Sequence, residues 1–192
     1  MIVLASKSTS RAAMLDAAGV VFRTAPANVD ERLIEAGMLG ADPATIAIAL
    51  AMAKAEAVDG GGDLVLGSDS LVVVDGRRFD KPASRTDARE HLLAFSGRTM
   101  ELHSAAALAR GGETVWNEAT VARLHVRELS SAFIEDYLDA EWPAVSHCVG
   151  VFRIEGRGVQ LFERIEGDHF TVLGMPLLPV LGALREFGEL LR

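Results

Sequence analysis

Short apolar runs alternate with apolar residues at helical spacing along the first third of the chain. Ile2 to Ala5 predicts a buried strand, and the next segment predicts a helix that ends at Gly19. Val20 to Thr24 predicts a second strand. Asp42-Pro43 is typical of a helix start, because a capping side chain precedes a proline, and Gly60 ends that helix. The chain therefore opens with strands and helices in alternation.

The same patterns continue to the end of the chain. Further strands are predicted at residues 64–66, 71–74, 77–79, 100–109, 114–126, 149–154 and 159–162. Further helices are predicted from Ser84 to about Phe95, from Ser130 or Ser131 to about Ala140, and from about Pro176. Asp75-Gly76 and Gly111-Gly112 predict hairpin turns, and residues 28–40 are irregular or weakly helical. This order predicts an α/β (mixed α+β) sheet protein, in one domain or in two lobes around a cleft.

Composition and charge exclude several classes of protein. Hydrophobic residues make up 49% of the 192 residues and charged residues 24%, which is an ordinary globular balance. The net charge is −8 and no Lys/Arg-rich block occurs, which argues against a nucleic-acid-binding protein. The longest apolar run after the N-terminal strand, Ile46 to Ala53, is far too short to cross a membrane. A single cysteine, Cys148, allows no intramolecular disulfide, so we expect a cytoplasmic protein with no membrane partner.

Three polar clusters lie where predicted strands end, which is where open α/β sheets bind ligands. The first, Ser6 to Arg11, combines hydroxyls, a guanidinium and a helix N-terminus, and either binds a phosphate or merely caps the helix. The second is Gly67-Ser68-Asp69-Ser70. Asp69 could bind Mg²⁺ or take a proton from water, or it could be a turn aspartate bonded to its own backbone. Gly67 would let the backbone approach a ligand closely.

The third cluster is Asp80-Lys81-Pro82. The preceding hairpin could bring Lys81 to the same cleft, whereas a loop lysine is more often a solvated charge. Lys54, on the helix that starts at Asp42, is a second candidate cation with the same alternative. The chain contains none of the standard nucleotide-binding or hydrolase motifs: G-x-x-x-x-G-K-[ST], G-x-G-x-x-G, G-x-S-x-G and H-E-x-x-H are all absent. Its five histidines lack the spacing of metal ligands.

In order along the chain, these clusters resemble the motifs of the Maf family of nucleoside triphosphate pyrophosphatases. The family's L-A-S-x-S-P-R-R corresponds to Leu4 to Arg11, its A-x-x-K-A to Ala51 to Ala55, its G-[AS]-D to Gly67 to Asp69, and its K-P to Lys81-Pro82. Later matches are Ser96-Gly97-Arg98, Gly150 to Gly156 and Gly174-Met175-Pro176-Leu177. Each motif is weak alone, but the ordered set covers almost the whole chain.

The resemblance implies a single Maf-like domain over residues 1–192, with an elongated mixed sheet like that of the Maf and ITPase folds, two lobes around a central cleft, and often a homodimer. It also implies Mg²⁺- or Mn²⁺-dependent release of pyrophosphate from a nucleoside triphosphate. By position, Asp69 matches the family's proton acceptor, and Glu31 lies with it near the metal. The residues that match phosphate-binding positions are Ser6, Ser8, Arg11, Lys54 and Lys81.

Departures from the family motifs concern the choice of nucleotide. Ser10 replaces one expected arginine, and Ser70 and Glu155 stand at the other specificity positions. Glu155 resembles the 7-methyl-GTP branch more than the branch that acts on dTTP and UTP, although that branch has Gln at the position of Ser70. A carboxylate could accept hydrogen bonds from a guanine edge. We therefore expect a preference for a modified purine triphosphate and a house-cleaning role against non-canonical nucleotides.

Three alternatives stay open at this point. The chain could be a phosphatase with Asp69 as nucleophile, although Leu71 stands where such enzymes carry a second acid. It could be a non-catalytic nucleotide sensor that binds through the same loops. Lastly, the family resemblance allows a structural, septum-associated partner protein, which no residue of the chain favours.

Overall fold

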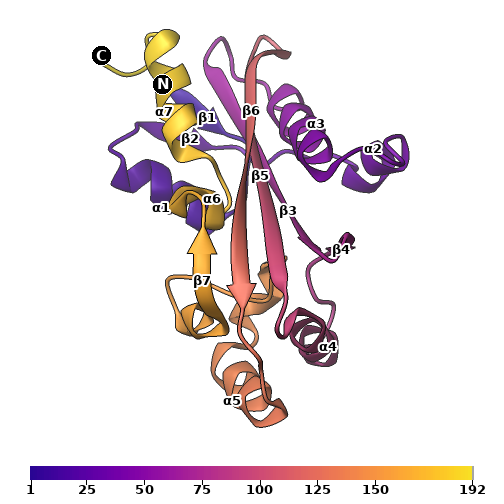
Figure 1. The fold of residues 1–192 in the computed structure, drawn as a ribbon. Coiled ribbons are helices and arrows are strands. Elements are labelled where there is room, and N and C mark those ends of the chain that lie inside the picture. Colours follow the sequence, from indigo (N-terminus) through magenta and orange to yellow (C-terminus); the bar gives the residue numbers. More distant parts are fainter. Residues whose placement is uncertain (192) are drawn as a thin grey trace. The chain divides into compact units, whose positions relative to one another are not determined.

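The structure, a computed structural model, describes residues 1–191 and contains a seven-stranded mixed sheet with flanking helices (Figure 1). The strands are β1 (Ile2–Leu4), β2 (Phe22–Thr24), β3 (Leu64–Val74), β4 (Arg77–Phe79), β5 (Thr99–Arg110), β6 (Glu113–Val126) and β7 (Phe162–Glu166). The helices are α1 (Thr9–Ala17), α2 (Glu31–Ala36), α3 (Pro43–Glu56), α4 (Arg85–Phe95), α5 (Ser131–Glu141), α6 (His169–Val172) and α7 (Leu177–Glu186), with 3-10 helices η1 (Ala144–His147) and η2 (Arg157–Leu161). The predicted α/β fold is confirmed.

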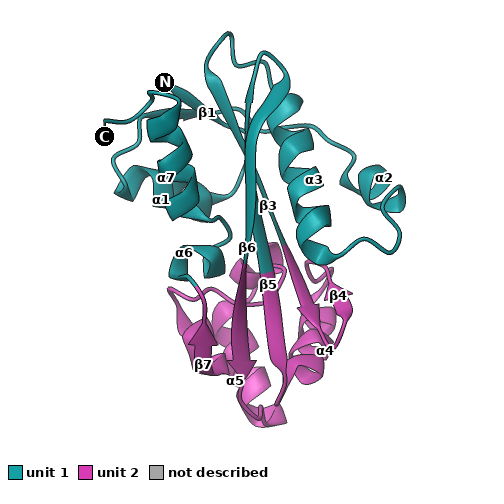
Figure 2. Cartoon of the chain, turned by 45° about the horizontal axis from the view of Figure 1, so that its top comes forward, with its two compact units in different colours: residues 1–70, 103–120, 168–192 teal, residues 71–102, 121–167 magenta. Residues whose placement is uncertain are grey.

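The strands pair in the order β2-β1-β3-β5-β6-β7, and β4 pairs with β3. β1 is parallel to both β2 and β3, whereas β3 with β4 and β6 with β7 are antiparallel. The chain divides into two compact units (Figure 2). Unit 1 comprises Met1–Ser70, His103–Thr120 and Asp168–Arg192, and unit 2 comprises Leu71–Leu102 and Val121–Gly167. Strands β3, β5 and β6 each contribute residues to both units.

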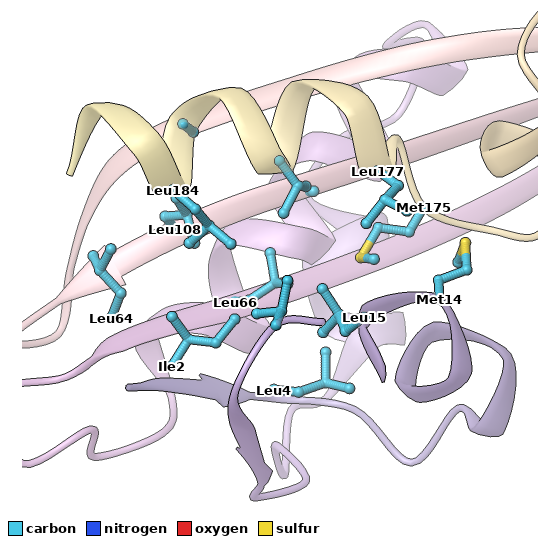
Figure 3. Packing of buried hydrophobic residues seen from close by; sticks show 14 residues of the cluster. Ile2, Leu4, Met14, Leu15, Leu64, Leu66, Leu108, Met175, Leu177 and Leu184 are labelled. Atoms are coloured by element: carbon cyan, nitrogen blue, oxygen red, sulfur yellow. The ribbon is translucent and has the colours of Figure 1, made fainter. Parts of the chain in front are cut away.

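The core of unit 1 is a layer of aliphatic side chains between the sheet and the helices α1 and α7. Leu4 of β1 and Leu66 of β3 are fully buried there, together with Leu15 of α1 and Leu184 of α7 (Figure 3). Residues two apart on a strand face the same side, so Ser68 and Ser70 follow Leu66 on this face of β3. The opposite face of β3 lies against α3 (Figure 2).

β3 is one continuous strand, and the prediction of two short strands with a loop at residues 67–70 was wrong. Gly67 allows the strand to continue beneath α3, because a Cβ atom there would lie 2.1 Å from the Ala51 carbonyl oxygen and 2.6 Å from the Ala55 nitrogen. The polar side chain of Ser68 donates a hydrogen bond to the Gly174 carbonyl, 3.3 Å away. Gly67 therefore serves the close approach of a helix, not of a ligand.

The strands predicted at 149–154 and 159–162 were also wrong. Val151 has a φ of 56°, which interrupts an extended backbone, and its N–H donates to the Cys148 carbonyl in a local turn. Residues 157–161 form η2 instead. The short helix α6 was not predicted; Asp168 caps it by accepting a hydrogen bond from the Thr171 N–H.

The predicted helix caps and the predicted Asp75-Gly76 turn are confirmed. Ser8, Asp42, Ser84 and Ser130 cap α1, α3, α4 and α5, respectively. Asp75 and Gly76 both have positive φ, at 50° and 74°, as the predicted hairpin turn requires. None of the helices within residues 1–191 combines the length and apolar character needed to span a bilayer.

Candidate functional site

The loop between β1 and α1 forms a polar N-terminus for α1. Ser8 caps the helix by accepting a hydrogen bond from the Arg11 N–H at 3.3 Å. Ser6 accepts one from the Ser8 N–H at 3.1 Å. The first N–H groups of a helix and its dipole favour an anion at this position.

Arg11 extends from α1 and is held by neutral acceptors. Its Nε donates to the Gly174 carbonyl at 2.9 Å, Nη1 to Ser6 Oγ at 3.3 Å, and Nη2 to Ser70 Oγ at 3.2 Å. A guanidinium has five N–H donors, so these three bonds leave two for a ligand. All three acceptors of these bonds are neutral oxygens. A guanidinium held in this way can offer its remaining N–H donors to a phosphate.

Lys54 links two carboxylates on the side of β3 that faces α3. Its Nζ lies 2.5 Å from Asp69 Oδ1 and 2.8 Å from Glu31 Oε1. The side chains of Lys54 and Asp69 are only 13% and 11% exposed, whereas that of Glu31 is 47% exposed. Gly67 brings α3 close to β3, and Lys54 of α3 thereby reaches Asp69.

The Arg11 guanidinium is close enough to the carboxylates of Asp69 and Glu31 to interact with them electrostatically. Burial lowers the pKa of the Arg11 guanidinium, and the carboxylates of Asp69 and Glu31 act in the opposite direction. Guanidinium, ammonium and carboxylates therefore form one charged cluster within unit 1, next to the N-terminus of α1.

The donor set of this cluster fits a divalent cation. The described residues contain no group of three or more His, Cys, Asp or Glu side chains that could hold a metal by themselves. Mg²⁺, however, is usually bound by one or two carboxylates together with substrate phosphates. Glu31 and Asp69 supply two carboxylates that already converge on one cation, the Lys54 ammonium.

Most of the predicted site residues lie together in unit 1. They are Ser6, Ser8, Arg11, Glu31, Lys54, Asp69 and Ser70. Ser10, a predicted specificity residue, also lies in unit 1, where its hydroxyl donates to the Leu173 carbonyl at 3.0 Å. That bond ties α1 to the loop after α6.

Lys81 and Glu155 belong to unit 2. Within that unit both charges act on the thiol of Cys148, whose pKa is raised mainly by burial and further by Glu155, while Lys81 lowers it. Cys148 itself is half-buried. The convergence of Lys81 with Asp69 stays a prediction.

Sequence reasoning missed the residues that hold Arg11 in place. The Gly174 carbonyl accepts from Arg11, Ser68 and Ser70, and Ser104 bonds Ser70 from β5. In the sequence, Gly174 stands out only as part of a family motif. Ser104 had one signal, a lone hydroxyl at the start of an apolar run, which does not reveal its partner.

Known proteins resemble this chain along almost its whole length. The family model described as Maf-like protein matches residues 1–187. A nucleoside triphosphate pyrophosphatase from Nitrobacter winogradskyi is 46% identical over 186 residues, covering 96% of this chain and 92% of that protein. A 7-methyl-GTP pyrophosphatase from Rhizobium meliloti is 44% identical over 194 residues, covering 99% and 98%. The chain belongs to the Maf family.

Proposed function

We propose that this chain is an enzyme that hydrolyses a nucleoside triphosphate to the nucleoside monophosphate and pyrophosphate with the help of a divalent cation. The observation that carries the proposal is the Lys54 ammonium bound to Asp69 and Glu31, in electrostatic contact with the half-buried Arg11. The names of the two relatives, nucleoside triphosphate pyrophosphatase and 7-methyl-GTP pyrophosphatase, support the same reaction class.

The N-terminus of α1 and Arg11 bind the phosphates in this proposal. A triphosphate carries about four negative charges near neutral pH, so several positive groups must gather its oxygens. Two N–H donors of Arg11 and the first N–H groups of α1 supply them. The hydroxyls of Ser6 and Ser8 fix this loop.

Asp69 acts as the proton acceptor. The oxygen of a water molecule attacks the α-phosphorus, its proton passes to the Asp69 carboxylate, and the bond from the α-phosphorus to the bridging oxygen breaks, so that pyrophosphate leaves. Lys54 holds the carboxylate in place through a 2.5 Å hydrogen bond. The low exposure of both side chains restricts competing water.

Glu31 and Asp69 would hold the Mg²⁺ or Mn²⁺ ion. When bound, such an ion supplies positive charge that screens the phosphate oxygens and favours departure of pyrophosphate. EDTA should therefore abolish turnover, and added Mg²⁺ or Mn²⁺ should restore it.

Product analysis combined with one substitution tests the proposal. The wild type should release pyrophosphate, and Asp69→Asn should lower kcat by about 10²- to 10⁴-fold, the usual contribution of a general base, while nucleotide binding persists. Asp16→Asn, an exposed acid on α1, serves as the matched control. Release of orthophosphate would favour the phosphatase alternative, and binding without turnover would favour a nucleotide sensor.

The nucleotide that we propose is a modified purine triphosphate such as 7-methyl-GTP. Support comes from Glu155, because a glutamate at this position resembles the 7-methyl-GTP branch of the family. Relatives named nucleoside triphosphate pyrophosphatase and 7-methyl-GTP pyrophosphatase match the chain at similar identity. A panel of standard and methylated triphosphates gives the ranking, and comparable kcat/KM on dTTP and 7-methyl-GTP would contradict this preference. Gel filtration would test the predicted homodimer.

A further inference from the structure

We propose that a chain of hydroxyl groups from Ser104 through Ser70 to the Gly174 carbonyl positions the Arg11 guanidinium, so that Ser70 and Ser104 are positioning residues for phosphate binding. The inference rests on the proposed function, because it concerns how the same site binds the polyphosphate part of its substrate. It reassigns Ser70, which the family resemblance connects with nucleotide choice.

The Gly174 carbonyl oxygen is the centre of this arrangement. It accepts from Arg11 Nε at 2.9 Å, from Ser70 Oγ at 2.9 Å and from Ser68 Oγ at 3.3 Å. Gly174 has a φ of 100°, a region that favours glycine, and a Cβ atom there would lie 3.3 Å from Ser70 Oγ. The backbone at this position is therefore shaped to place a carbonyl between Arg11 and β3.

Ser104 extends the chain into the interior of unit 1. It is fully buried on β5, and its hydroxyl lies 2.9 Å from the Thr171 carbonyl and 3.0 Å from Ser70 Oγ. Because Arg11 can only donate, Ser70 Oγ must present a lone pair to Nη2 in every arrangement of the hydroxyl protons. The contact with Ser104 limits the orientations of the Ser70 hydroxyl and so holds in place the oxygen that accepts from Arg11.

When Ser104 donates to Ser70, the Ser70 hydroxyl has no hydrogen-bonding capacity left for a nucleobase. A serine hydroxyl has one proton and two lone pairs, and Ser70 has three partners: Arg11, the Gly174 carbonyl and Ser104. A base could compete only by breaking one of these bonds. Ser70 therefore acts on the phosphates through Arg11.

The neutral character of the acceptors matters for the charge of Arg11. A carboxylate partner would offset the guanidinium charge, whereas hydroxyl and carbonyl oxygens hold the group and leave its charge for the ligand. Holding the side chain before the ligand arrives also reduces the entropy lost on binding. Loss of either serine should thus weaken phosphate binding without altering which base is preferred.

The experiment uses inorganic tripolyphosphate, which carries no base, as the probe in calorimetric titration of the full chain. Ser104→Ala and Ser70→Ala should each weaken its affinity about tenfold, as expected for a lost hydrogen bond that serves a charged group. Ser70→Thr retains the hydroxyl and should restore most of the affinity. Thr120→Val is the matched control, because it removes a bond to the Thr171 side chain and leaves the Thr171 carbonyl in place.

The ranking of triphosphates by kcat/KM should be the same in Ser70→Ala as in the wild type, with every KM raised. Unchanged tripolyphosphate affinity in a folded Ser104→Ala protein would overturn the inference, and so would a changed ranking of bases in Ser70→Ala with unchanged affinity. A wild type that binds tripolyphosphate but hydrolyses no triphosphate would overturn the proposed function and leave the positioning inference standing.

Discussion

At the residue scale, Lys54 stabilises two carboxylates of different exposure. Asp69 is slightly more buried than the lysine, whereas nearly half of the Glu31 side chain is exposed. A buried charge that loses its partner costs far more free energy than an exposed one. The two carboxylates should therefore differ in how much their ion pairs contribute to the free energy of unfolding.

We predict that Lys54→Met lowers the free energy of unfolding by roughly 3 kcal/mol, because Asp69 is left buried without its partner. Glu31→Gln, the matched variant, should cost less than about 1 kcal/mol. Urea denaturation of both variants without nucleotide or metal measures the two losses. Equal losses would contradict the prediction, because the buried Lys54–Asp69 pair would then contribute no more to the free energy of unfolding than the exposed Lys54–Glu31 pair.

At the element scale, the approach of α3 to β3 determines where Lys54 lies. Gly67 is the contact point, and the atoms that a Cβ would meet are backbone atoms of Ala51 and Ala55. Backbone atoms of a helix cannot move aside individually as a flexible side chain can. A larger residue would have to displace the whole helix together with Lys54.

Gly67→Ala should consequently destabilise the protein by about 1–3 kcal/mol or more, the usual cost of overpacking, and lower kcat as Lys54 moves away from Asp69. Gly182→Ala on α7 is the opposite case, since nothing lies within 4 Å of the added Cβ. It should stabilise the protein by roughly 0.5–1 kcal/mol through helix propensity. Thermal unfolding compares both variants, and a wild-type melting temperature for Gly67→Ala would contradict the prediction.

The elements that the sequence predicted correctly are those with local causes. Ser8 and Asp42 cap helices through atoms three residues away, and Asp75-Gly76 forms its turn from its own dihedral preferences. The continuity of β3 has a distant cause, because Ser68 finds its acceptor at Gly174, 106 residues later. The polar residues 67–70 therefore predict a loop, because no local pattern indicates that their hydrogen-bond partners lie far away in the sequence.

The difference between local and distant causes also decides which residues of the site could be predicted from the sequence. Asp69, Lys54 and Arg11 were identified by motif and chemistry, and their arrangement around β3 agrees with a shared charged cluster. The role of Ser104 depends on strand pairing and on a carbonyl, and a carbonyl has no signature in a sequence.

At the scale of the whole molecule, the two units are interleaved along the chain and each contains one tryptophan. Trp116 belongs to unit 1 and Trp142 to unit 2. Unit 2 also holds His91 on α4, whose ring packs edge-on against Phe79 with a centroid distance of 5.1 Å. The fluorescence of Trp142 in a Trp116→Phe background can report how this unit responds to pH.

Burial lowers the pKa of His91, while Asp87, 3.4 Å from its Nε2, acts in the opposite direction. The unfolded chain therefore binds a proton to this histidine more readily than the folded chain does. Stability should be fully present above pH 6.5, the ordinary value, and should fall as the pH drops below it. His91→Phe keeps an aromatic ring and should flatten that decline between pH 8 and 5, and parallel profiles for the two proteins would contradict this.

The partners of Arg11 also have a consequence for protein synthesis. Leu173 and Gly174 follow Ser10 and Arg11 by 163 residues, so both segments must be present before the guanidinium is held. Translation proceeds at about 5–20 residues per second, so the α6–α7 region is synthesised well after α1. A nascent polypeptide that has not reached α6 therefore carries the motif residues without the finished anion site, and competence to bind nucleotide arises only after residues 173 and 174 have been synthesised.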